Sequence, residues 1–343
     1  SLVLVALECL PLGWLFPPDP RGAARDFCAA GMFVSRDDEL RHFDLVPSTS
    51  LSVGARQYRH NARGLRGPEV AERKAPNTLR IAVVGDSYTY GWGVEENETI
   101  PAQLGQQLER HLPQGRAIEV VNAGVPAYDT GPEFGLLRDV VMPLAPDVVV
   151  LVFQTNDITT VDYFYLDDLK AFYACELPLG YRLKRSLDHS RLYHLLRRGY
   201  TSLKRRLGFA WFAESEWPRT SAYLDDIIAL CRRAHVRLLI ANLPHFQIGS
   251  SREFSDQGAS TFSRQSEWVN ALAREHDVPC VDILPLVRAR VRELKPVEAL
   301  YVDPVNDHHL NAAGCALVAG AVAEQMVRLE WLLPSPPGAD AAR

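Results

Sequence analysis

The feature that most constrains this fold is an unbroken apolar run at residues 81–84, which is followed directly by Gly85, Asp86 and Ser87. A short apolar run bounded by glycine is typical of a strand that is buried on both faces of a parallel sheet. The carboxyl ends of such strands line the crevice where open α/β sheets bind their ligands. Ser87 is therefore a candidate nucleophile, although glycine, aspartate and serine are also common in plain turns.

Four more runs, mostly apolar, come later in the chain, and they alternate with segments of helical period. The runs lie at residues 118–121, 148–153, 236–241 and 278–283. In the first helical segment Ile100, Leu104, Leu108 and Leu112 recur every four residues, as on the buried face of an amphipathic helix. This alternation predicts an α/β fold, namely a three-layer α/β/α sandwich with a central parallel sheet of about five strands.

Four short blocks occur in order along the chain: VVGDSYTYG, VVNAGVPAYDT, LVFQTNDI and NDHHLNAAG. They resemble the four blocks of the SGNH (GDSL-type) hydrolase superfamily. The segment HNARGLRGPEV, which precedes the first block, is similar to one in the membrane-anchored bacterial members of that superfamily. The resemblance covers about residues 79–330, with GDSY in place of GDSL. It implies that the residues behind the family's four letters are Ser87, Gly124, Asn156 and His309.

By this resemblance the chain is a serine esterase or O-acyltransferase that acts on a carbohydrate or lipid ester. Ser87 would form the acyl-enzyme, and His309 would take the hydroxyl proton and return it to the leaving group. The oxyanion would be held by the Ser87 N–H, the Gly124 N–H and the side-chain amide of Asn156. We expect a glycine at position 124 to let the substrate approach closely, because it has no Cβ.

Several of these residues also have simpler interpretations. Gly124 could be an ordinary turn at the end of a strand, and Asn156 could cap a following helix. Tyr88, Tyr90 and Trp92 are expected to pack in the core or the cleft rather than to bind substrate.

The carboxylate that would orient His309 is where the sequence departs from the family pattern. The family usually places this acid three residues before the histidine, and that position holds Asn306. Asp307 is the preferred substitute, and Asp303 is the alternative. His308 is expected to point away from the site, because side chains alternate along an extended chain.

Under a second hypothesis the chain has the same fold but no catalytic activity, and it is a membrane-anchored accessory subunit of a larger membrane complex. The retained Ser87 and His309 favour the enzyme, whereas Asn306 favours the accessory subunit. A third hypothesis, a flavodoxin-like nucleotide binder, is rejected because no GxGxxG or GxxxxGK[ST] loop follows the first apolar run.

Charge and cysteine spacing limit the classes of partner and cofactor that we expect. The net charge of −5 disfavours a nucleic acid partner. The six cysteines form no CxxC or Cys/His spacing, so neither a metal nor another cofactor is expected. The expected partners are therefore a small-molecule or glycan ester as substrate, a membrane, and a membrane protein complex under the second hypothesis.

The predicted organisation has an apolar anchor, a lead-in segment that packs on the core, a hydrolase-like domain with one insertion, and a disordered tail. These parts cover residues 1–20, 21–78, 79–332 with the insertion at 158–216, and 333–343. Residues 2–16 are apolar except for Glu8, which predicts part of a membrane-spanning helix or signal anchor, with a packed amphipathic helix or a signal-peptide remnant as alternatives. The domain would then lie outside the cytoplasm, on the periplasmic side. The insertion would form a lid or substrate wall, or a docking surface.

Overall fold

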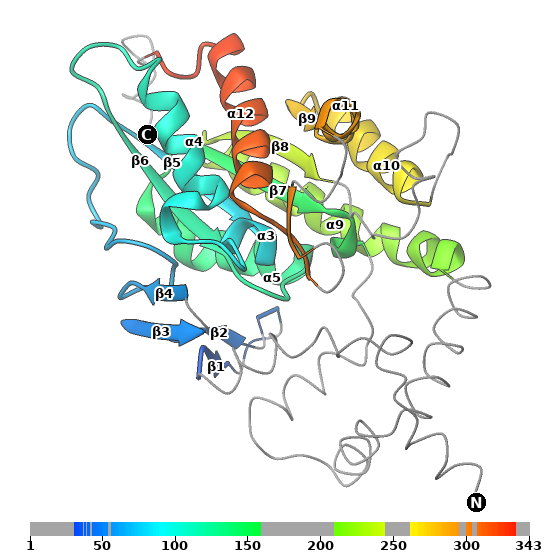
Figure 1. The fold of residues 1–343 in the computed structure, drawn as a ribbon, viewed down its shortest axis with the longest axis horizontal. Coiled ribbons are helices and arrows are strands. Elements are labelled where there is room, and N and C mark those ends of the chain that lie inside the picture. Colours follow the sequence, from blue (N-terminus) through cyan, green and yellow to red (C-terminus); the bar gives the residue numbers. More distant parts are fainter. Residues whose placement is uncertain are drawn as a thin grey trace, which may run out of the picture.

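A five-stranded parallel sheet forms the centre of the molecule, with the strand order β6-β5-β7-β8-β9 (Figure 1). The computed structural model describes residues 31–36, 38, 40–41, 43–53, 56–158, 209–243, 261–294, 300–303 and 307–333. The strands are β5 (Thr78–Gly85), β6 (Ala117–Gly124), β7 (Val148–Gln154), β8 (Arg237–Leu243) and β9 (Cys280–Asp282). The predicted fold class and the five predicted strands are thus confirmed.

The centres of β5 and β7 are unbroken apolar runs, at residues 81–84 and 148–153, because both faces of these strands are buried. In β7, Val148, Val150 and Val152 join one hydrophobic cluster, whereas Val149 and Leu151 join the cluster on the other face. Side chains of a strand point alternately to its two faces, so an unbroken apolar run is what a strand covered on both sides requires.

Helices form the two outer layers (Figure 1). Residues of α4 (Ile100–Glu109), α11 (Leu284–Leu294) and α12 (Ala312–Arg328) pack on one face of the sheet. Residues of α5 (Thr130–Leu136), α9 (Phe209–Arg233) and α10 (Thr261–Glu275) pack on the other. A π-helical turn, η2 (Leu137–Val141), and a 3-10 turn, η3 (Met142–Leu144), continue α5.

Short elements follow β5 and β7, and a hairpin lies between α11 and α12. They are α3 (Ser87–Tyr90), η1 (Glu96–Glu98), η4 (Thr155–Asp157) and the antiparallel hairpin of β10 (Tyr301–Asp303) and β11 (Asp307–Leu310). This hairpin and α11 were not predicted. The hairpin strands have only three and four residues, too few for a hydrophobic period to stand out.

The segment before the sheet forms two antiparallel hairpins, β1 (Phe33–Ser35) with β2 (Phe43–Leu45), and β3 (Thr49–Val53) with β4 (Arg56–His60). Phe43, Leu45, Tyr58 and Leu65 belong to the same hydrophobic cluster as β6 and α5. Arg41 adds an ion pair to Asp139, with a distance of 3.2 Å between Nη2 and Oδ2. The lead-in segment therefore shares its core with the sheet.

The expectation of a membrane anchor and an extracytoplasmic domain is corrected. None of the helices within the described residues combines the length and the apolar character needed to cross a membrane. The 25-residue helix α9, for example, is interrupted by charges such as Asp225, Asp226 and Arg232. The apolar start at residues 1–20, most of the insertion at 158–216 and residues 334–343 lie outside the described residues.

Candidate active site

Ser87 is the first residue of α3 and follows β5 after a single turn residue, Asp86. Asp86 caps the helix, since its side chain accepts a hydrogen bond of 2.9 Å from the Tyr88 N–H. A Cβ atom on Gly85 would lie 2.2 Å from Thr89 Oγ1 and 3.0 Å from the carbonyl oxygen of Val152. Glycine at this position therefore lets α3 fold back tightly onto the end of the sheet and present Ser87.

His309 reaches Ser87 from the other end of the chain. Its Nε2 atom lies 2.8 Å from Ser87 Oγ, which is a hydrogen-bond distance. The imidazole lies between two aromatic rings, with centroid distances of 5.1 Å to Tyr88 and 5.7 Å to Trp92. Both rings are nearly fully buried, so they pack against the histidine as expected and limit how it can rotate.

The order of the strands explains why these groups meet. The chain goes from β5 to one edge of the sheet at β6, and then returns to the other side of β5 at β7. Crevices in doubly wound sheets open at such a reversal, beyond the carboxyl ends of the strands. Ser87 follows β5, and Asn156 follows β7 within η4, so both lie at this position. The side chain of Asn156 lies outside the described part of the chain.

Gly124 is the last residue of β6 and pairs directly with Gly85. Its N–H donates a hydrogen bond of 3.0 Å to Asn122 Oδ1. A Cβ at this position would lie 2.1 Å from the backbone nitrogen of Tyr90. The structure gives a physical reason for a glycine here in addition to the expected one: the space is needed by the backbone of α3.

The two candidate acids lie on the β10–β11 hairpin that carries His309. Asp303 and Asp307 are direct partners across the hairpin, with an irregularity in register between Tyr301 and Asp303. Positions 307 and 309 share one face of β11, and position 308 lies on the other. The side chains at 303, 307 and 308 lie outside the described residues.

Two buried acids, Glu133 and Asp157, lie near Asp86 and were not predicted. Burial, with Asp86 and Asp129 nearby, raises the pKa of Glu133 well above its ordinary value. Burial, followed by Glu133 and Asp86, likewise raises the pKa of Asp157, although a 2.8 Å hydrogen bond from the Gln154 N–H opposes this. Neither oxygen of Glu133 has a hydrogen-bond partner within the described residues. In the sequence, Glu133 resembles an ordinary acid in the first turn of a helix.

Other reactive groups of the described residues do not compete with Ser87. Burial raises the pKa of the Cys231, Cys280 and Cys315 thiols to about 12, so none of them supplies a thiolate near neutral pH. No group of histidine, cysteine and acidic residues in the described ranges is arranged to hold a metal ion.

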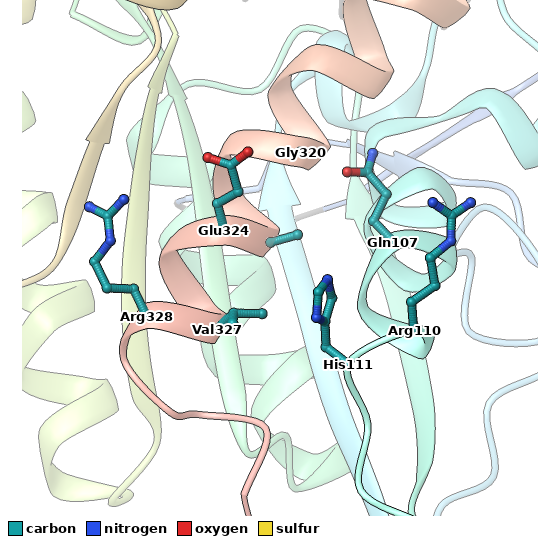
Figure 2. A pocket seen from close by; sticks show the side chains of 8 residues that line it. Gln107, Arg110, His111, Gly320, Glu324, Val327 and Arg328 are labelled. Carbon is teal, nitrogen blue, oxygen red and sulfur yellow. The ribbon is translucent and has the colours of Figure 1, made fainter.

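A cavity of about 400 Å³ lies between α4 and α12, away from the Ser87–His309 pair (Figure 2). Its lining includes Arg110, His111, Glu324 and Arg328. Large pockets are the usual starting point for locating an active site. This one contains neither a serine nor a cysteine in its lining, so the hydrogen-bonded Ser87–His309 pair is the better candidate.

Comparisons of this chain with known proteins give a family match and several similar solved structures. No curated protein matches it. Among solved structures, a lipase/acylhydrolase from Enterococcus faecalis is 13% identical, covers 72% of this chain and 94% of its own, and has a TM-score of 0.43. An acetylxylan esterase from Geobacillus stearothermophilus is 16% identical with the same two coverages and a TM-score of 0.45. A family model described as GDSL-like Lipase/Acylhydrolase family matches residues 83–317, which is more than half of the chain.

Proposed function

Since this chain belongs to the GDSL-like lipase/acylhydrolase family, whose members hydrolyse esters, we propose that it works through an acyl-enzyme on Ser87. The observation that carries the proposal is the 2.8 Å contact between Ser87 Oγ and His309 Nε2. A serine hydroxyl is a weak nucleophile at its own pKa and needs an adjacent base of this kind.

In the proposed reaction, Ser87 Oγ attacks the ester carbonyl carbon while His309 Nε2 takes the hydroxyl proton. The tetrahedral intermediate collapses, the C–O bond to the leaving group breaks, and His309 returns the proton to the departing alkoxide. Water then attacks the acyl-enzyme with His309 as base, and this releases the acid and regenerates Ser87. If a sugar hydroxyl attacks the acyl-enzyme in place of water, the acyl group passes to the sugar, and the protein acts as an O-acyltransferase.

The proposed oxyanion donors are the Ser87 N–H, the Gly124 N–H and the Asn156 amide. The position of Ser87 at the start of α3 supports the first, because N–H groups at a helix start have no partner within the helix. The hydrogen bond from Gly124 to Asn122 sets a condition on the second. The substrate oxygen would have to replace Asn122 Oδ1 as the acceptor.

Asp307 is the proposed partner of His309, with Asp303 as the alternative. Support comes from the strand geometry, since positions 307 and 309 lie on one face of β11. The acid would hold the imidazole in the tautomer that leaves Nε2 free to accept the proton from Ser87.

A carbohydrate ester or a lipid ester is the proposed substrate class. The two are separated by comparing acetylated xylo-oligosaccharides with aryl esters of increasing acyl length. Faster turnover of the acetylated sugar would favour the carbohydrate ester, and a rise in kcat/KM with acyl length would favour the lipid ester.

The experiment that tests the mechanism compares Ser87→Ala with Ser50→Ala, an exposed serine on β3. Turnover of a short-chain aryl ester should be lost in the first and kept in the second. A fluorophosphonate probe should label the parent protein on Ser87 and leave Ser87→Ala unlabelled. Wild-type turnover in Ser87→Ala, with unchanged circular dichroism, would rule the mechanism out.

A further inference from the structure

Arg66 lies where the lead-in segment meets the turn that follows α3. Its side chain is buried, and its backbone forms isolated bridges to His60 of β4 and to Asn122 of β6. The residue therefore joins the β3–β4 hairpin to the edge of the central sheet. A buried arginine is rare unless its donors are used, because burial of an unpaired charge is costly.

The guanidinium donates to three carbonyl groups of one short stretch. Nη1 donates to the carbonyl oxygens of Tyr90 (2.9 Å) and Gly91 (2.5 Å), and Nη2 donates to that of Val94 (2.8 Å). These carbonyls belong to the end of α3 and the turn after it, where a helix leaves acceptors unsatisfied. A planar fork of donors suits this set, whereas a lysine ammonium would present a single point charge.

Aromatic residues hold the guanidinium and bind the same turn. The Cζ atom of Arg66 lies 4.5 Å from the ring centroid of Tyr58 and 4.9 Å from that of Tyr90. Tyr58 also accepts a hydrogen bond of 3.1 Å from the Gly93 N–H through its hydroxyl oxygen. His60 Nε2 lies 2.9 Å from the Tyr90 hydroxyl. The lead-in segment thus contacts residues 90–94 through the polar side chains of Arg66, Tyr58 and His60.

Residues 90–94 are linked to two parts of the candidate active site. Ser87 begins α3, and its carbonyl accepts the N–H groups of Gly91 and Trp92 at 3.1 and 3.0 Å. Trp92 packs against the ring of His309. A shift of this turn would therefore move Ser87 together with Trp92, the ring that packs against His309.

We propose that Arg66 is a positioning residue for the ester hydrolysis: by binding the carbonyls of Tyr90, Gly91 and Val94 it fixes Ser87 and Trp92 relative to His309. This rests on the proposed function of Ser87. The expected consequence is a loss in kcat with little change in KM, because Arg66 orients the reacting groups and its donors are used by the protein backbone. A misplacement of about 1 Å at a reacting group can cost about 10²-fold in rate.

The test uses the full chain with the substitution Arg66→Lys, and Arg59→Lys as its matched control. Arg59 lies on the same lead-in segment, but its side chain is 55% exposed and pairs with Glu96 at the surface. Arg66→Lys should lower kcat for an aryl ester by about 10²-fold with KM within a few-fold. It should slow fluorophosphonate labelling of Ser87 similarly and speed amide hydrogen exchange in residues 87–94. Arg59→Lys should match the parent protein in all three.

A second variant keeps the proposal testable where Arg66→Lys does not fold. Tyr58→Phe removes only the acceptor of the Gly93 N–H, and it should lower kcat several-fold with faster exchange in the same turn. Parent-like kcat and labelling in folded Arg66→Lys, or in Tyr58→Phe where Arg66→Lys does not fold, would overturn the proposal, because the position of residues 90–94 would then not limit the reaction. Failure of the proposed function is distinguishable, because turnover would then persist in Ser87→Ala.

Discussion

Asp303 and Asp307 face each other across the β10–β11 hairpin, which also carries the histidine that contacts Ser87. Two like charges opposite each other are unfavourable, so we expect only one of the two carboxylates to bind His309. Strand alternation favours Asp307, because position 307 shares a face with position 309 and Asp303 reaches that face only from the partner strand.

We predict that Asp307→Asn lowers aryl esterase kcat by about 10³- to 10⁴-fold, since loss of the acid leaves the imidazole in the wrong tautomer. Asp303→Asn should change kcat less than about 10-fold on the same reasoning. Steady-state kinetics measure both, with the exposed Asp226→Asn as control. The reverse order would assign the role to Asp303, and little loss from either would indicate a serine–histidine dyad or a non-catalytic role for the chain.

Glu133 gives a second prediction for a single residue. Its raised pKa means that the folded protein binds its proton more tightly than the unfolded chain does. The stabilising effect of that proton is fully present below the unfolded pKa of about 4.5 and is lost as pH rises through the folded value. Glu133→Gln, which mimics the protonated acid, should therefore raise the free energy of unfolding at pH 8 and change it little at pH 4.

Urea unfolding at several pH values measures this difference, with the exposed Glu109→Gln as control. The variant-minus-parent difference should grow with pH for Glu133 and stay flat for Glu109. A flat difference for both would show that Glu133 remains charged in the folded protein at no cost.

At the level of elements, the active site depends on how closely α3 lies against the ends of β5 and β6. Gly85 and Gly124 form this junction, and a side chain on either would meet α3 at 2.2 Å and 2.1 Å respectively. The next prediction is that Gly124→Ala lowers the free energy of unfolding by about 3 kcal/mol or more, as overpacking of a core does. Turnover should fall in parallel because α3 carries Ser87.

Gly105 offers a matched control on α4. A Cβ there would meet only the Val120 side chain, at 3.2 Å, and alanine is the better helix former by about 1 kcal/mol. Gly105→Ala should therefore be neutral or stabilising in the same denaturation experiment. Equal stability of the Gly124 and Gly105 variants would contradict the close packing of α3 against β6.

At the scale of the whole molecule, the lead-in hairpins and the sheet behave as one unit because buried polar contacts join them. His60 is one of these contacts: Nδ1 lies 3.0 Å from the carbonyl oxygen of Val46, and Nε2 lies 2.9 Å from the Tyr90 hydroxyl. Burial lowers the pKa of His60 to about 4, with the nearby Arg66 acting in the same direction. The neutral ring then donates from Nδ1 and accepts the Tyr90 hydroxyl at Nε2.

A lowered histidine pKa destabilises the fold in acid. The contribution of neutral His60 is fully present above its unfolded pKa of about 6.5 and is lost as pH falls toward about 4, where the unfolded chain binds a proton that the folded protein does not. The loss amounts to about 3 kcal/mol over this range. We predict that His60→Gln flattens the decline in unfolding free energy between pH 6.5 and 4.5, whereas the exposed His111→Gln leaves it unchanged. An equally steep decline in His60→Gln would contradict the lowered pKa.

The sequence by itself determined the layers of the fold and the position of the proposed nucleophile. A strand buried on both faces is apolar over most of its length, so β5, β6 and β7 are visible as mostly apolar segments, and the residues directly after each segment lie at the carboxyl edge of the sheet. Ser87 and Asn156 could be placed there without coordinates. His309 could be chosen over His308 by its block, and the 2.8 Å contact with Ser87 then joined two residues far apart in the chain.

Only the tertiary structure decided what surrounds these groups. Arg66 in a glycine-rich segment and Glu133 in a first helical turn both resemble solvated surface residues, because a side chain's exposure depends on elements remote in sequence. The structure buries both: Arg66 lies against the turn after α3, and Glu133 lies near Asp86 and Asp129. Gly124 shows the same dependence, since the space that it keeps free is filled by α3. Local pattern is set by the period of the backbone, whereas burial, charge state and close approach are set by which elements pack together.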